Sequence, residues 1–99
     1  MIRREGERMT VSGALTLANV AAALEQGRTA IVAGARTVDL AGVGELDSSA
    51  LALLLAWLRE AKRHGSGLVF NNLPQGLTTI ARLYGVAELL PAAPAPARH

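Results

Sequence analysis

The sequence contains no cysteine, few aromatic residues and no long hydrophobic run. Without cysteine the chain cannot form a disulfide, a thiolate metal site or a cysteine nucleophile. With only 3% aromatic residues, the core must be built from Leu, Ala and Val. The longest apolar run, Ala50 to Leu58, is much shorter than the roughly 18 to 20 residues of a membrane span. The N-terminal stretch MIRREGERM lacks the apolar region of a signal peptide, so we expect a cytoplasmic protein.

The charge of the chain is close to balanced, with ten basic and eight acidic residues and a net charge of +2. Arg3, Arg4 and Arg8 alternate with Glu5 and Glu7 and do not form a basic run. A nucleic-acid binder of this size would concentrate Lys and Arg on one face and would often interleave aromatic residues for base stacking. The charge pattern therefore argues against nucleic-acid binding.

The order of apolar patterns predicts an α/β fold with a mixed, roughly four-stranded sheet and helices packed on it. Alternation at Met9 and Val11 predicts a strand that pairs as a hairpin with one near residues 2–5 through Gly6. Further strands are expected at 37–41 and 68–71, and helices at 16–34, from Ser48 or Ser49 to Arg63, and within 72–85. We expect one domain over 1–90 and a disordered, Pro- and Ala-rich tail over 91–99.

The triplet Asp47-Ser48-Ser49 stands immediately before the leucine-rich helix and is the first candidate site. A serine nucleophile needs a nearby base, but the only histidines are His64 and His99. At about 1.5 Å per residue, His64 lies roughly 24 Å along the helix from Ser48. The chain also lacks a phosphate-binding loop and an HExxH motif, so we expect a protein that is not an enzyme.

Two roles of the triplet remain compatible with the residues. Ser48 or Ser49 can cap the helix, while Asp47 adds negative charge at its positive end. A phosphate on an exposed serine at a helix start would also meet free backbone N–H groups. The triplet is therefore either a cap alone or a cap that carries a switch.

The helix that follows carries more apolar residues than one buried face requires. Its expected core stripe contains Leu51, Leu54, Leu55 and Leu58, and its wet side contains Arg59, Glu60 and Arg63. Leu53 and Trp57 fall outside the core stripe. Either Trp57 is a core-edge residue covered by a loop, or these two side chains form an exposed docking patch beside the serines.

The strand ending in VDLAGV, a short turn and the triplet before a leucine-rich helix resemble the STAS domain family, over about Met9 to Leu90. The family includes bacterial anti-sigma factor antagonists. The resemblance implies an α/β fold. It also implies that Ser48 occupies the position that is phosphorylated in those antagonists. These proteins usually have Gly two positions later, where this chain has Ala50.

The stretches LALLLAWLREAKRHG and LTTIARLYGVAELLP are similar to the MlaB group of STAS domains. This resemblance implies a subunit without catalysis or cofactor that binds the ABC ATPase MlaF, in a complex with the permease MlaE and with MlaD. That complex moves phospholipid at the inner membrane and maintains outer-membrane lipid asymmetry. The expected partner-binding residues are Asp47, Ser48, Ser49, Leu53 and Trp57, and an exposed patch would also allow a homodimer of the isolated protein. The alternative is an anti-sigma factor antagonist regulated at Ser48.

Overall fold

The computed structural model describes residues 1–91 and contains the strands and helices in the order that the sequence predicts. The strands are β1 (Ile2–Glu5), β2 (Arg8–Leu15), β3 (Thr37–Leu46) and β4 (Val69–Asn71); the helices are α1 (Val20–Val32), α2 (Ser48–Arg63), α3 (Gln75–Leu83) and a 3-10 turn, η1 (Ala87–Leu89). None of the helices in this part of the chain is long and apolar enough to cross a membrane. The predicted tail lies, apart from Pro91, outside the described residues.

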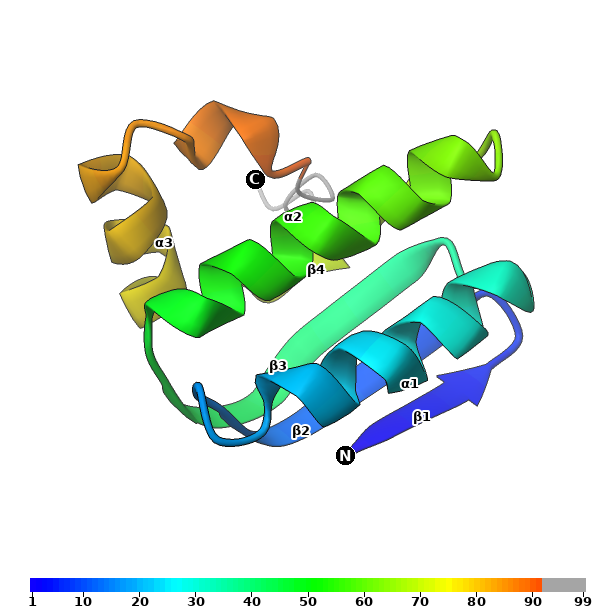
Figure 1. Cartoon of the computed structure of the whole chain (residues 1–99), viewed down its shortest axis with the longest axis horizontal. Helices are drawn as coiled ribbons and strands as arrows, with labels where there is room; N and C mark the ends of the chain where they lie inside the picture. The colour runs from blue at the N-terminus through cyan, green and yellow to red at the C-terminus, as the bar shows by residue number, and fades with distance from the viewer. Residues whose placement is uncertain (92–99) are drawn as a thin grey trace, which may run out of the picture.

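The sheet is mixed and four-stranded, as predicted. Its strands follow the chain order, β1-β2-β3-β4; β1 and β2 are antiparallel, whereas β3 is parallel to both β2 and β4. Gly6 adopts φ +62° in the β1–β2 turn. Connections between parallel strands are right-handed. Because β2, β3 and β4 are adjacent in chain order, the helices that connect them, α1 and α2, lie on the same face of the sheet. Figure 1 shows α1 and α2 side by side over one face of the sheet, starting at the same end.

The core lies between the sheet and its helices and is mostly aliphatic. The expected alternation along β2 is confirmed: Met9 and Val11 are fully buried, and Arg8 and Ser12 are exposed. Leu54 of α2, like these two residues, has no exposed surface. Packing of small and branched side chains thus holds the helices on the sheet.

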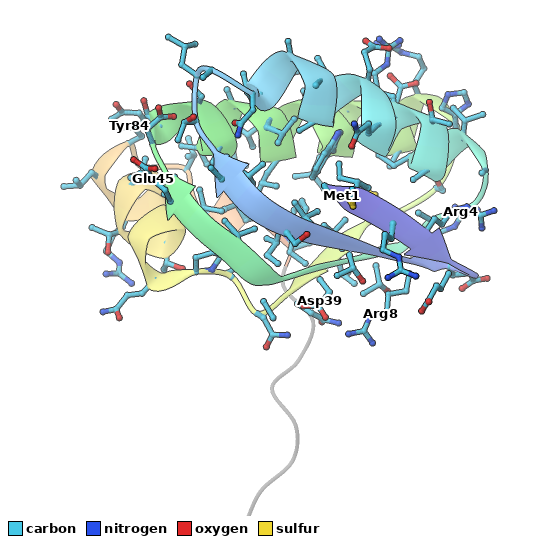
Figure 2. The ribbon with its side chains drawn as sticks, turned by 90° about the horizontal axis from the view of Figure 1, so that it is seen from below. Met1, Arg4, Arg8, Asp39, Glu45 and Tyr84 are labelled. Atoms are coloured by element: carbon cyan, nitrogen blue, oxygen red, sulfur yellow. The ribbon has the colours of Figure 1, made fainter. Side chains whose placement is uncertain are left out.

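The opposite face of the sheet carries a polar network around Asp39. Figure 2 shows Asp39 and Arg8 on the side of the sheet away from α1 and α2. Asp39 is 7% exposed and accepts hydrogen bonds from Asn72 Nδ2 (2.9 Å), from the Ala41 backbone N–H (3.0 Å) and from Arg8 Nη2. The Asn72 amide, the Ala41 N–H and the Arg8 guanidinium together lower the pKa of Asp39. This carboxylate ties β2, β3 and the segment after β4 together.

Helix α1 begins later than the sequence predicts. Thr16 does not cap it, because residues 16–19 form a separate turn in which the Thr16 carbonyl accepts from the N–H groups of Asn19 and Val20, both at 3.0 Å. Asn19 Oδ1 accepts from the Thr16 N–H at 2.7 Å and closes this turn. Leu17, predicted for the apolar face of the helix, therefore lies in the turn and is 76% exposed. Gly34 ends the helix as expected, with φ +120°.

Candidate docking site

The start of α2 is capped by Asp47 and not by a serine. Asp47 has an extended backbone conformation, and its Oδ1 accepts from the Ser49 N–H at 2.8 Å. Its Oδ2 accepts from the Leu17 N–H at 3.1 Å. The Leu17 and Ser49 backbone N–H groups lower the pKa of Asp47. Asp and Ser cap equally well at this position, so the sequence alone could not decide between them. One carboxylate thus joins the β2–α1 turn to the first turn of α2.

The two serines occupy the first turn of α2, where Ser48 is exposed and Ser49 is half-buried. Figure 1 places this turn beside the start of α1, at the end of the sheet where β2 and β3 finish. The structure brings Asp47, Ser48 and Ser49 together as expected, with the hydroxyl of Ser48 at the surface. His64 caps the opposite end of the same helix. Within residues 1–91, no group of three or more His, Asp or Glu side chains could hold a metal ion.

Of the two alternatives for Leu53 and Trp57, the exposed docking patch is wrong. Leu53 is 2% exposed and Trp57 has no exposed surface, because α1 packs along this side of α2. The Trp57 indole lies against Gly27, and its Nε1 donates to the Leu24 carbonyl at 3.3 Å. Trp57 is therefore a core residue, covered by a helix where the sequence suggested a loop, and it offers no surface to a partner.

An apolar groove lies between the first halves of α1 and α2, beside the serines. It has a volume of about 450 Å³. The exposed Leu17 and Ala21 stand on the α1 side, Ala52 and Ala56 on the α2 side, and the side chain of Leu53 at the floor. This groove could not be predicted from the sequence, because it depends on the packing of the two helices. Ser49 is part of its lining, so the groove adjoins the predicted site.

An ionic cluster closes the far end of α2. Glu60, expected on the wet side, is 7% exposed and receives Arg28 Nε of α1 at 3.3 Å and Arg63 Nη1 at 3.2 Å. His64 Nε2 donates to its other oxygen at 3.0 Å. The hydrogen bond from His64 and the charges of Arg28 and Arg63 lower the pKa of Glu60. This cluster fixes α1 against α2 beyond the groove.

Comparison with known proteins identifies the class. A family profile described as "Mlab, STAS domain" matches residues 1–91, so the chain belongs to the STAS domain family, in its MlaB group. A relative from Escherichia coli K12, the intermembrane phospholipid transport system binding protein MlaB, is 32% identical over 87 residues, which cover 87% of this chain and 89% of the relative. The resemblance inferred from the two sequence stretches is confirmed.

Solved structures agree with this assignment. A chain of the Acinetobacter MlaFEDB complex in an ATP-bound conformation matches with a TM-score of 0.75 and 28% identity, covering 88% of this chain and 94% of that one. The unphosphorylated anti-sigma factor antagonist SpoIIAA matches with a TM-score of 0.69 and 18% identity, covering 95% and 87%. The second likeness concerns the fold alone. The α/β STAS fold expected from the sequence is confirmed.

Proposed function

We propose that the protein is a non-catalytic STAS subunit of a phospholipid transport complex and that it binds the ABC ATPase of that complex, an MlaF-like protein. Its place is the inner face of the inner membrane, which it reaches through the ATPase, an MlaE-like permease and an MlaD-like protein. There it supports assembly and activity of a complex that maintains outer-membrane lipid asymmetry. The observation that carries this proposal is the similarity to MlaB over nearly the whole of both chains.

The start of α2 supports a docking role for Asp47, Ser48 and Ser49. An exposed hydroxyl beside an apolar groove has the composition of a protein interface, with a polar group at the rim of an apolar centre. Asp47 contributes by holding both sides of this surface in place through its two hydrogen bonds. Leu53 contributes only the floor of the groove.

Ser48→Asp tests the docking surface. A carboxylate at this exposed position would be buried without a partner on binding, so we expect affinity for the purified ATPase to fall at least about tenfold. Ser12→Asp is the matched control, because Ser12 is also exposed but lies on β2. Biolayer interferometry measures the affinity, and far-UV circular dichroism checks the fold. Equal affinity of Ser48→Asp and wild type would contradict the docking role.

The exposed Ser48 also favours one alternative function, a phosphorylation-regulated antagonist of an anti-sigma factor. Tagged protein purified from its host in mild detergent separates the two, with bound partners identified by mass spectrometry. Recovery of an ABC ATPase with a membrane permease supports the transport subunit. Recovery of a soluble kinase that binds only when Ser48 is unmodified supports the antagonist.

A further inference from the structure

The groove between α1 and α2 is lined mostly by small and apolar side chains. Its walls carry Ala21, Ala52 and Ala56, and small side chains allow the axis of a third helix to approach closely. Leu17 stands at its edge with 76% of its surface exposed, although Asp47 holds its backbone in place. An ordered leucine that remains largely exposed beside an apolar groove marks a contact surface.

A positive charge, that of Arg59, lies at the far end of the groove and indicates which charge a binding partner would carry there. Arg59 is exposed and lines the groove at the C-terminal side of Ala56. Nearby Arg28 and Arg63 both pair with Glu60, whereas no carboxylate within residues 1–91 pairs with Arg59. An occupant that carries a carboxylate at this end would therefore complement the groove.

We propose that the groove receives one amphipathic helix of the ATPase subunit, with its apolar face on Leu17, Ala21 and Ala52 and an acidic residue against Arg59. Recognition of an amphipathic helix by a groove of two helices is a recurrent mode of binding. This inference rests on the proposed function and names the part of the partner that docks.

Neighbouring alanines of α1 provide a matched test. Ala21 and Ala22 are both exposed on the same helix, but only Ala21 lines the groove. Ala21→Glu should weaken binding to the purified ATPase at least about tenfold, because it buries an unpaired charge, while Ala22→Glu should bind within about twofold of wild type. Equal affinities for the two variants would overturn the groove as the docking site. If wild type itself does not bind the ATPase, the proposed function fails before this comparison.

Charge reversal at Arg59 tests the proposed contact with an acidic residue of the partner helix. Arg59→Glu and Lys62→Glu change the charge of α2 by the same amount at exposed positions, but Lys62 does not line the groove. We expect Arg59→Glu to lose at least about fivefold more affinity than Lys62→Glu, because it sets two carboxylates against each other. Similar losses for both variants would mean that only the net charge matters and would overturn the acidic contact.

Photo-crosslinking identifies the occupant directly. A benzophenone side chain at position 21, with position 22 as the control, is introduced into the full chain and activated in the assembled complex. A crosslinked peptide from an amphipathic helix of the ATPase, obtained at position 21 and not at 22, is the expected result. A crosslink to a second copy of this chain, to the permease or to lipid would overturn the proposal, and so would no crosslink while the ATPase remains bound.

Discussion

Gly27→Ala tests the packing of α1 on α2 most sharply, since general helix propensity predicts the opposite sign. Replacing a helical Gly by Ala ordinarily stabilises a protein by about 0.5–1 kcal/mol. At Gly27, however, an added Cβ would lie 2.2 Å from Cε2 and Nε1 of Trp57. That distance is more than 1 Å inside the roughly 3.5 Å at which carbon atoms make contact.

The indole of Trp57 cannot move aside without a large cost in free energy, because it is completely buried and its Nε1 donates a hydrogen bond to the Leu24 carbonyl. Overpacking of a core costs about 1–3 kcal/mol. Losing the indole hydrogen bond adds about 0.5–1.5 kcal/mol. After subtraction of the propensity gain, we expect Gly27→Ala to lower the free energy of unfolding by about 0.5–4 kcal/mol.

Urea denaturation followed by circular dichroism at 222 nm measures this change. Gly76→Ala is the control, because an added Cβ there would meet only Leu46 Cδ1, at an ordinary 3.6 Å, and should not lower the stability. In a Trp57→Phe background the smaller ring leaves room for the methyl group, so Gly27→Ala should cost much less there. A Gly27→Ala protein as stable as wild type would refute the close contact.

Two further predictions concern buried and capping carboxylates. The pKa of Asp47 is lowered in the folded protein, so its charge stabilises the fold above the unfolded pKa of about 3.9 and ceases to do so as the pH falls through the folded value. The stability advantage of wild type over Asp47→Asn, measured by urea denaturation from pH 7 to pH 2, should therefore shrink below about pH 4; an advantage that does not change with pH would contradict this. Asp39→Ala removes the acceptor shared by Arg8 and Asn72 and should cost about 1.5–3 kcal/mol by the same assay at pH 7, whereas a change below about 0.5 kcal/mol would show that the network contributes little.

The features that the sequence predicts correctly depend on local patterns. The leucine-rich run from Ser48 to Arg63 forms one helix, and Gly6 turns the first two strands into a hairpin. The alternation around Met9 identifies the buried face of β2. Such patterns report the period of each element, which suffices for the order of strands and helices and hence for the fold class.

The burial of Leu53 and Trp57 could not be obtained from α2 alone. A helical wheel shows which residues share a face, but it does not show how many neighbours the helix has. Helix α2 packs against the sheet and also contacts α1 and α3, so its buried surface is wider than one stripe. The sequence contained one clue, Gly27. A glycine inside a helix lowers its stability, and it is often present because another group packs closely against the backbone there. That glycine accommodates the only tryptophan of the chain.

The sequence located the three residues of the candidate site at the start of α2, but it did not identify which of them caps the helix. Asp47, Ser48 and Ser49 lie at the start of α2 as expected, yet the carboxylate is the cap and also binds the Leu17 N–H. A contact across 30 positions of sequence, between two connections that leave neighbouring parallel strands, has no local pattern. The groove has the same origin and became visible only with the packing of α1 on α2.

The position of Trp57 gives the protein an intrinsic fluorophore at the contact between α1 and α2. Trp57 is the only tryptophan, so tryptophan fluorescence reports on this one site. Its buried environment next to Gly27 shifts the emission maximum to shorter wavelength. Any event that separates the two helices would admit water to the indole and move the emission toward the red. Separation of α1 from α2 can therefore be followed in real time, without a label, by the emission of this one residue.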